Sequence, residues 1–174
     1  MSYNLKAIEV MISSPSDVER EREAVRSALA DWNAAHARKR KICLLPVGWD
    51  THIPPQFGRK KRPQDIINKK ALAGCDILVG VFWTRIGSHT GQEISGSVEE
   101  IKFHVRRKKR TMLYFCDLPV PSNLIDVEQQ ESLKNFRVWA SSNAIVRSYL
   151  TYDDFLRKLY QDISITMNGY RSNV

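Results

Sequence analysis

The segment 77–83, with the sequence ILVGVFW, constrains the fold of this chain more than any other segment. It is apolar at every position and contains β-branched residues. A strand with one solvent-exposed face would alternate apolar and polar residues, whereas a parallel strand covered by helices on both sides is apolar throughout. The segment therefore predicts a central strand of a parallel sheet that lies between two helical layers.

Similar but shorter apolar runs recur along the chain, and a segment with helical periodicity follows each of them. We expect strands at 6–12, 42–49, 77–83, 111–116 and 144–148. We expect helices from about 18 to 37, and at 63–73, 96–108, 127–140 and 153–167. This alternation predicts a three-layer, flavodoxin-like α/β fold with a five-stranded parallel sheet in the order 2-1-3-4-5. Pro46 favours an edge position or a bulge for the second strand.

The length of 174 residues fits one domain, which we expect to span 1–174. No apolar run approaches the roughly 20 residues of a membrane span, and the N-terminus carries no signal-peptide pattern, so we expect a cytoplasmic protein. The three cysteines and four histidines show no zinc-binding spacing. The sequence therefore predicts no metal site.

Polar and aromatic residues gather where the expected strands end. Ligands of open α/β sheets bind at the carboxyl ends of the strands, where the strand order reverses. The candidate binding residues at these ends are Ser13, Ser14, Trp49, Asp50, Trp83, Arg85, Ser95, Gly96 and Ser97. The two tryptophans can stack on a flat ring such as a nucleobase, although each can equally pack over the end of the sheet.

Two adjacent glutamates, Glu99 and Glu100, fall in the first turn of the helix expected after Gly96. Neighbouring residues point about 100° apart on a helix. Glu100 shares an edge of the buried stripe with Ser97, so it is the candidate catalytic carboxylate. Glu99 is expected to face solvent or to interact with the helix N-terminus. The alternative for Glu100 is the same electrostatic role at the helix N-terminus.

The net charge of +8 suggests an anionic partner. Basic runs at 38–41 and 106–110 are expected at the amino end of the sheet, away from the crevice. A third run, near the crevice mouth, is placed to attract substrate phosphate and consists of Arg59, Lys60, Lys61 and Arg62. Aromatic residues are not interleaved with these runs and no nucleic-acid-binding motif occurs, so we do not expect DNA or RNA binding. The phosphate-loop, dinucleotide-binding and nucleophile-elbow motifs are also absent from the sequence.

Two segments, 75–79 (CDILV) and 95–101 (SGSVEEI), resemble the nucleoside 2-deoxyribosyltransferase-like superfamily. That family has an Asp-led apolar strand, a variable loop, and a Ser-Gly-Thr-x-x-Glu turn into a helix. Ser97 stands in the place of the threonine, and the family's nucleophilic glutamate falls on Glu100. The segment 10–15 (VMISSP) looks like the first strand and loop of Toll/interleukin-1-receptor-like (TIR-like) domains, many of which cleave NAD with a glutamate.

The likeness is strongest to bacterial TIR-like domains at the N-terminus of larger, often defence-related proteins. It rests on 48–52 (GWDTH), 62–68 (RPQDIIN) and 76–85, and it covers roughly 7–120. The resemblance implies a nucleotide substrate, self-association, and an effector or sensor partner, which can be a C-terminal region or a separate protein. It also implies antiviral defence as a setting. NAD would be a substrate rather than a cofactor, and no cofactor is expected.

Three functions are consistent with these features. The first is hydrolysis of an N-glycosidic bond in a nucleotide, with NAD as the first candidate, in which Glu100 stabilises or traps the ribose cation. The second is transfer of a deoxyribosyl group between bases by the same glutamate. The third is a non-catalytic module that binds a nucleotide signal or self-associates.

Overall fold

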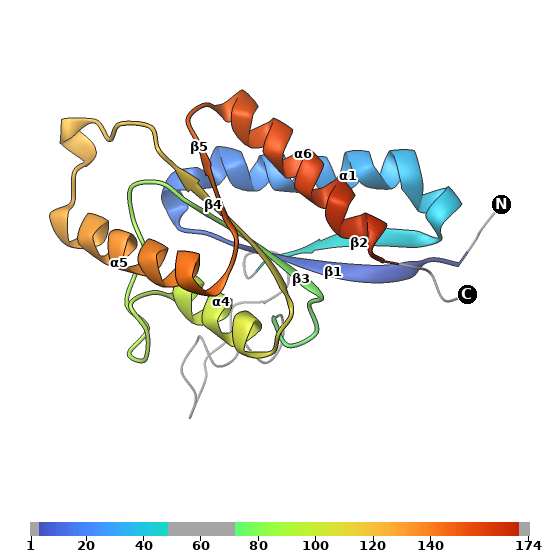
Figure 1. Ribbon diagram of the computed structural model, residues 1–174, viewed down its shortest axis with the longest axis horizontal. Coiled ribbons are helices and arrows are strands. Elements are labelled where there is room, and N and C mark those ends of the chain that lie inside the picture. The colour runs from blue at the N-terminus through green and yellow to red at the C-terminus, as the bar shows by residue number, and fades with distance from the viewer. Residues whose placement is uncertain (1–3, 49–71, 171–174) are drawn as a thin grey trace.

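Five strands form one parallel sheet in the computed structural model, which describes residues 4–48 and 72–170. The strands are β1 (Lys6–Ser13), β2 (Ile42–Val47), β3 (Ile77–Phe82), β4 (Arg110–Cys116) and β5 (Val146–Tyr149). Their order is β2-β1-β3-β4-β5 (Figure 1), which confirms the predicted flavodoxin-like order. The order reverses between β1 and β3, and β2 with Pro46 lies at an edge, as expected.

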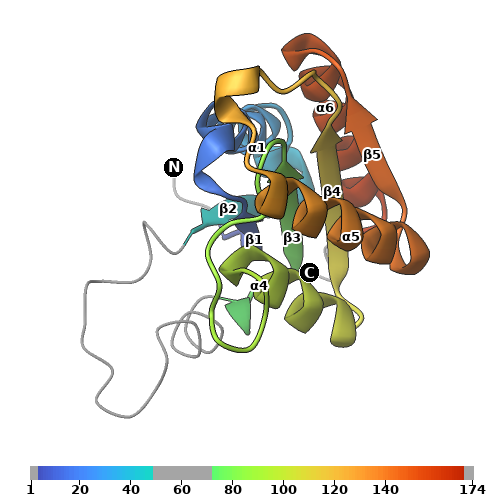
Figure 2. The same ribbon diagram turned by 90° about the vertical axis from the view of Figure 1, so that its left-hand side faces the viewer.

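Helices cover both faces of this sheet. They are α1 (Glu19–Arg40), α4 (Gly96–Arg106), α5 (Val127–Asn143) and α6 (Tyr152–Asn168), with short 3-10 turns η1 (Ser16–Val18) and η3 (Ser122–Leu124). The helices α1 and α6 lie on one face, and α4 and α5 lie on the other (Figures 1 and 2). In the parts of the chain that the structure describes, no helix is long and apolar enough to span a membrane.

The predicted element boundaries differ from the observed ones by a few residues. The first helix continues three residues beyond the expected end and stops where Lys41 adopts a left-handed conformation with φ of 57°. The fifth strand begins at Val146 instead of residue 144, because α5 continues to Asn143. The end of the second strand at Trp49 and nearly all of the helix expected at 63–73 lie outside the described residues.

The sheet separates two hydrophobic cores, and the side chains of β1 point alternately into one and the other. Ile8 and Val10 pack into the cluster beneath α1 and α6, whereas Met11 packs into the cluster beneath α4 and α5. All six residues of β3 are buried. The fully apolar sequence of this strand is therefore explained by burial on both faces.

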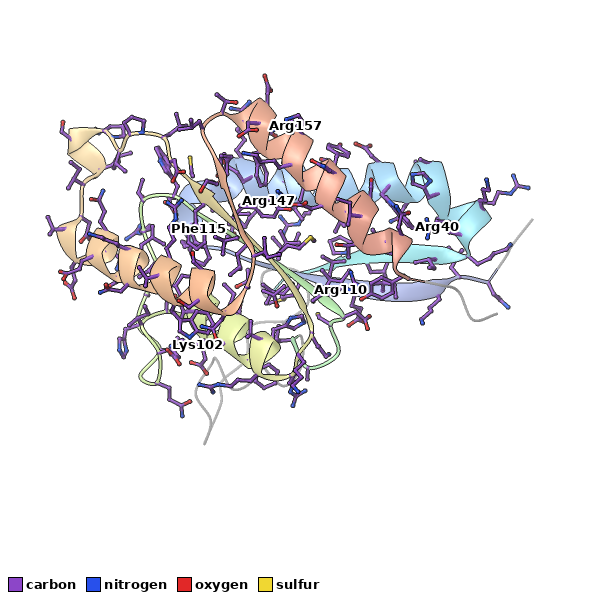
Figure 3. The ribbon with its side chains drawn as sticks, viewed as in Figure 1. Arg40, Lys102, Arg110, Phe115, Arg147 and Arg157 are labelled. Carbon is purple, nitrogen blue, oxygen red and sulfur yellow. The ribbon has the colours of Figure 1, made fainter. Side chains whose placement is uncertain are left out.

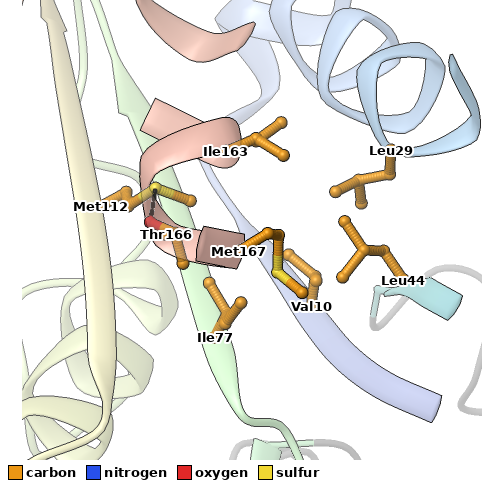
Figure 4. A pocket seen from close by; sticks show the side chains of 8 residues that line it. All are labelled: Val10, Leu29, Leu44, Ile77, Met112, Ile163, Thr166 and Met167. Carbon is orange, nitrogen blue, oxygen red and sulfur yellow. Dashed lines mark hydrogen bonds between the residues drawn. The ribbon is translucent and has the colours of Figure 1, made fainter. Parts of the chain in front are cut away.

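A small gap remains in the core between α1, α6 and the sheet (Figure 4). Its volume is about 10 Å³. It is lined by Val10, Leu29, Leu44, Ile77, Met112, Ile163, Thr166 and Met167. The Thr166 hydroxyl donates a weak hydrogen bond to the Met112 sulfur at 3.7 Å. The walls are otherwise apolar and the space is near the minimum for one water, so this gap is a packing defect and not a ligand site.

Gly80 lets α4 approach the sheet closely. A Cβ at this position would lie 2.8 Å from the Leu113 side chain and 3.2 Å from the Ile101 side chain of α4. Gly80 is also paired in register with Ser13 at the end of β1. The absence of a side chain here thus brings the first turns of α4 against the carboxyl ends of β1 and β3.

The basic runs at 38–41 and 106–110 lie at the amino end of the sheet, as predicted. Ile42 of β2 pairs with Lys6, and Arg110 of β4 pairs with Ile77, so the first run ends just before β2 and the second ends at the first residue of β4. Several of these cations contact the end of α6. Arg40 donates to the Met167 carbonyl at 2.9 Å, and Figure 3 shows Arg40 and Arg110 toward this side of the molecule.

Candidate active site

A cleft of about 550 Å³ opens at the carboxyl ends of β1 and β3, at the point where the strand order reverses. Three segments that are distant in sequence meet there: the loop after β1 with the start of α1, the loop after β3, and the first turn of α4. The lining residues are Ser14, Pro15, Ser16, Arg22, Arg85, Gly87, Ser88, Ser95, Gly96, Ser97 and Glu100. This volume lies within the range of small-ligand sites.

Glu100 is the carboxylate that lines this cleft, and it is only 3% exposed. The hydroxyl of Ser13, at the last position of β1, donates to Glu100 Oε2 at 2.6 Å. The same hydroxyl lies 3.5 Å from the Ser97 carbonyl oxygen. The structure thus brings together Ser13, Ser97 and Glu100, as the sequence predicted from strand order and helical phase. The hydrogen bond fixes the orientation of a carboxylate that would otherwise be costly to bury.

The first turn of α4 forms one wall of the cleft. The Ser95 side chain accepts a hydrogen bond from the Val98 amide at 3.2 Å, and this cap starts the helix. Gly96 and Ser97 line the cleft, and their amides precede the first intrahelical bonds. The positive end of the helix dipole therefore lies at the cleft, in the same turn region as Glu100.

Glu99 was expected to face solvent or to interact with the helix N-terminus; it lies in the first turn of α4, but it does not face solvent. It is 8% exposed, and its Oε2 accepts a hydrogen bond from the Thr90 hydroxyl at 2.6 Å. Thr90 belongs to the loop between β3 and α4, and its amide donates to the Glu93 carbonyl oxygen at 3.1 Å. Glu99 therefore anchors this loop on α4, and it does not line the cleft.

Two further contacts hold the start of the same loop. Asp17 Oδ2 accepts hydrogen bonds from both the amide and the hydroxyl of Thr84, each at 2.8 Å. Gln129, in the first turn of α5, accepts from the Ile86 and Gly87 amides at 3.0 Å and donates to the Gly87 carbonyl at 3.2 Å. Gly87 has a φ of +104°, which an L side chain rarely adopts. The wall of the cleft that contains Arg85 and Gly87 is thus held from two sides.

Arg22 is a site residue that the sequence did not reveal. It lies near the start of α1, is half-buried, and lines the cleft. Its Nε atom is buried without a hydrogen-bond partner. Arg85, which the sequence did predict, is exposed and lines the same cleft. Ser14, also predicted, lines it with a buried hydroxyl that has no partner.

Trp83 lies elsewhere. It lines a second, smaller cleft of about 230 Å³ together with Phe82 and Phe115, and it does not line the cleft of Glu100. Its indole Nε1 donates to the Leu118 carbonyl at 3.2 Å, so the ring is held over the loop that follows β4. Two positions were expected for Trp83, stacking on a ligand ring or packing over the end of the sheet. The structure fits the second. The other predicted residues, Trp49, Asp50 and the run Arg59 to Arg62, lie outside the described part of the chain.

One turn after Glu100, His104 is completely buried. Its ring nitrogens lie 3.1 Å from the Thr111 hydroxyl and 3.4 Å from the Cys75 carbonyl oxygen. Burial lowers the pKa of His104 from 6.5 to about 4, so the imidazole is neutral at pH 7. Burial also raises the pKa of the Cys75 thiol from 9.0 to about 12. These two side chains belong to the core behind the site, and neither lines the cleft.

Within residues 4–48 and 72–170, no group of three or more His, Cys, Asp and Glu side chains could hold a metal ion. The polar lining of the cleft is instead rich in hydrogen-bond donors, with Glu100 as its carboxylate. Such a lining suits an organic ligand that carries negative charge.

Solved structures similar to this chain share its fold at low sequence identity. Translation elongation factor SelB from Methanococcus maripaludis, in its apo form, has a TM-score of 0.50 and 11% identity, over 97% of this chain and 36% of its own. The chain thus spans about a third of that protein. Flavodoxin 1 from Bacillus cereus has a TM-score of 0.41 and 8% identity, over 95% and 99% of the two chains. These likenesses concern the fold alone, which the strand order already establishes.

Comparison with curated proteins gives no match. A family model does match, and it covers residues 9–164, which include most of β1, all of the other four strands, the cleft and Glu100. The chain therefore belongs to the family described as "Domain of unknown function (DUF4062)".

Proposed function

We propose that this chain hydrolyses the N-glycosidic bond of a nucleotide, with NAD as the first candidate substrate. The observation that carries the proposal is Glu100, a buried, oriented carboxylate that lines a cleft of about 550 Å³ at the switch point of the sheet. Ligands of open α/β sheets bind at this position. The resemblance to the nucleoside 2-deoxyribosyltransferase-like superfamily selects the same residue as the nucleophile, and many of the TIR-like domains that the chain also resembles cleave NAD with a glutamate.

The chemistry requires a carboxylate beneath the ribose. As the bond from C1′ to the nicotinamide nitrogen breaks, its electron pair leaves with neutral nicotinamide and positive charge develops on the ribose ring. Glu100 stabilises this charge or forms an ester with C1′, and water then completes the reaction. The products are ADP-ribose, nicotinamide and one proton, which passes to solvent.

Ser13 acts as a positioning residue in this scheme. Its hydroxyl holds Glu100 Oε2 at 2.6 Å and joins the end of β1 to α4. Because Ser13 and Glu100 are both buried, the carboxylate has little freedom to rotate away from the cleft. A fixed carboxylate stabilises a developing charge without reorganisation, which is the main source of electrostatic catalysis.

The test is release of a free base from a panel of substrates at high protein concentration. NAD, NADP, a nucleoside and a deoxynucleotide are incubated separately, and the products are separated by chromatography. We expect release of nicotinamide from NAD and none from the neutral nucleoside. Absence of release from every substrate would overturn the proposal. A rate that depends on an added acceptor base would instead indicate transfer between bases.

A non-catalytic nucleotide-binding module is the second candidate, and the bond between Ser13 and Glu100 is the observation that favours it. This bond also links two secondary-structure elements, so Glu100 can have a purely structural role. Under this alternative the protein binds NAD without turnover, and a Glu100→Gln variant retains biological activity. Loss of activity in a folded Glu100→Gln variant would exclude the alternative.

A further inference from the structure

We propose that Arg22 and Arg85 hold a diphosphate group in the cleft, so that the site selects phosphorylated nucleotides over neutral nucleosides. The inference builds on the proposed function, because it concerns the same cleft. It adds a residue, Arg22, and a basis for substrate selection, and it can be tested without turnover.

The environment of Arg22 is the strongest support for this diphosphate site. Its side chain is half-buried at the cleft, and its Nε–H group has no acceptor although it is shielded from solvent. An unsatisfied guanidinium donor is unfavourable, and phosphate oxygens are the acceptors that the planar fork of arginine fits best. The neighbouring Arg20, by contrast, packs its guanidinium 3.6 Å from the centre of the Tyr152 ring. Arg22 is therefore placed for a ligand in a way that Arg20 is not.

Arg85 supplies the second cation, from the loop after β3. It is exposed and follows Thr84, which Asp17 holds with two hydrogen bonds. Gln129 holds the next two residues, Ile86 and Gly87. The backbone at Arg85 is thus fixed while its side chain remains available to a ligand.

Uncharged donors complete the subsite. The amides of Gly96 and Ser97 lie at the N-terminus of α4, where helices favour phosphate. Ser14 adds independent evidence, because its side chain is 8% exposed, lines the cleft and carries a hydroxyl without a partner. Glu100 is the carboxylate of the lining and accepts the bond from Ser13. Two cations and several neutral donors thus complement the double negative charge of a diphosphate.

A neutral nucleoside would leave both guanidinium groups without a counter-ion. Each charge-assisted hydrogen bond to phosphate is worth about tenfold or more in affinity. The cleft should therefore bind ADP-ribose at least tenfold more tightly than adenosine. The prediction separates a nucleotide hydrolase from a deoxyribosyltransferase, whose nucleoside substrates carry no phosphate.

The test is calorimetric titration of Glu100→Gln protein, in which turnover is prevented, with ADP-ribose, inorganic pyrophosphate and adenosine. Arg22→Gln and Arg85→Gln should each weaken binding of ADP-ribose and pyrophosphate by about tenfold or more. Adenosine binding should change by less than about twofold. The control is Lys39→Gln, which removes the same charge from an exposed position at the far end of α1. It should leave all three affinities unchanged.

Arg22→Lys guards against a folding defect, because it keeps the charge and loses only the guanidinium fork. Its affinity for ADP-ribose should lie between that of the parent, which is the Glu100→Gln protein with both arginines intact, and that of Arg22→Gln. The proposal is overturned if the parent binds neither ADP-ribose nor pyrophosphate, or if both arginine variants bind them as tightly as the parent does. Arginine-dependent ADP-ribose binding in a wild-type protein that cleaves no NAD would refute the proposed hydrolysis and support the diphosphate subsite.

Discussion

Stability of the fold should fall between pH 6.5 and pH 4 because of one buried histidine. The ring of His104 is completely buried beside the Thr111 hydroxyl and the Cys75 carbonyl. Burial is the main cause that lowers its pKa from 6.5 to about 4 in the folded protein. In this pH interval the unfolded chain therefore binds a proton that the folded protein does not.

The sign and the size of the effect follow from this difference. A folded-state pKa below the unfolded value gives a stabilisation that is complete above pH 6.5 and is lost as the pH falls toward 4. Each pKa unit corresponds to about 1.4 kcal/mol. The difference between the unfolded-state pKa of 6.5 and the folded-state pKa of about 4 thus corresponds to about 3 kcal/mol of unfolding free energy. This is a large part of the stability of an ordinary domain.

The pH dependence of the unfolding free energy can be measured by urea unfolding of the wild type and of His104→Leu. The measurement is repeated at several pH values between 7.5 and 4. The exchange leaves no buried group without a partner, because Lys109 Nζ still donates to the Cys75 carbonyl at 2.6 Å and Thr111 still donates to the Lys109 carbonyl. The difference in unfolding free energy between the two proteins should change by about 3 kcal/mol over this range, to the disadvantage of the wild type at low pH. An exchange at exposed His36 retains His104 and should follow the wild type. Parallel curves for wild type and His104→Leu would refute the reasoning.

Three other substitutions test individual contacts near the site and in the core by urea unfolding at pH 7. Ser13→Ala removes the donor to the buried Glu100 carboxylate and should cost about 1.5 to 3 kcal/mol; a loss below about 0.5 kcal/mol would mean that the bond contributes little. Gly80→Ala places a Cβ 2.8 Å from the Leu113 side chain and should cost about 1 to 3 kcal/mol, whereas an unchanged stability would show that the neighbours move freely. Thr166→Val replaces a hydroxyl bonded only weakly to sulfur and should change stability by less than about 1 kcal/mol, and a larger loss would contradict that assignment.

The sheet and the main site residue could be predicted because both depend on short-range patterns. The apolar segment 77–83 indicates a strand buried on both faces, and the alternation of strands and helices leads to the observed order. Glu100 could be distinguished from Glu99 by helical phase, since Ser97 and the buried stripe define the side of α4 that meets β1. The position of the cleft then follows from the strand order.

The remaining features depend on contacts between segments that are far apart in sequence. Glu99 is buried because Thr90 folds back onto α4, and no periodicity indicates the path of that loop. Arg22 lies in a run of alternating charges that looks like an ordinary solvated helix face, and only the tertiary structure distinguishes it from Arg20. The indole of Trp83 is held by the Leu118 carbonyl, which belongs to the loop after another strand.

Cleavage of the glycosidic bond by Glu100 is the proposed reaction. Its most direct test is the rate of nicotinamide release from NAD by the wild type, Glu100→Gln and Glu99→Gln, with far-ultraviolet circular dichroism as the check on folding. Glu99 is the matched control, because it is the adjacent buried carboxylate of the same helix but does not line the cleft. We predict that Glu100→Gln lowers the rate by roughly a thousandfold or more while Glu99→Gln retains most of it. Equal losses in the two folded variants, or a Glu100→Gln rate within about tenfold of the wild type, would contradict a catalytic role for Glu100.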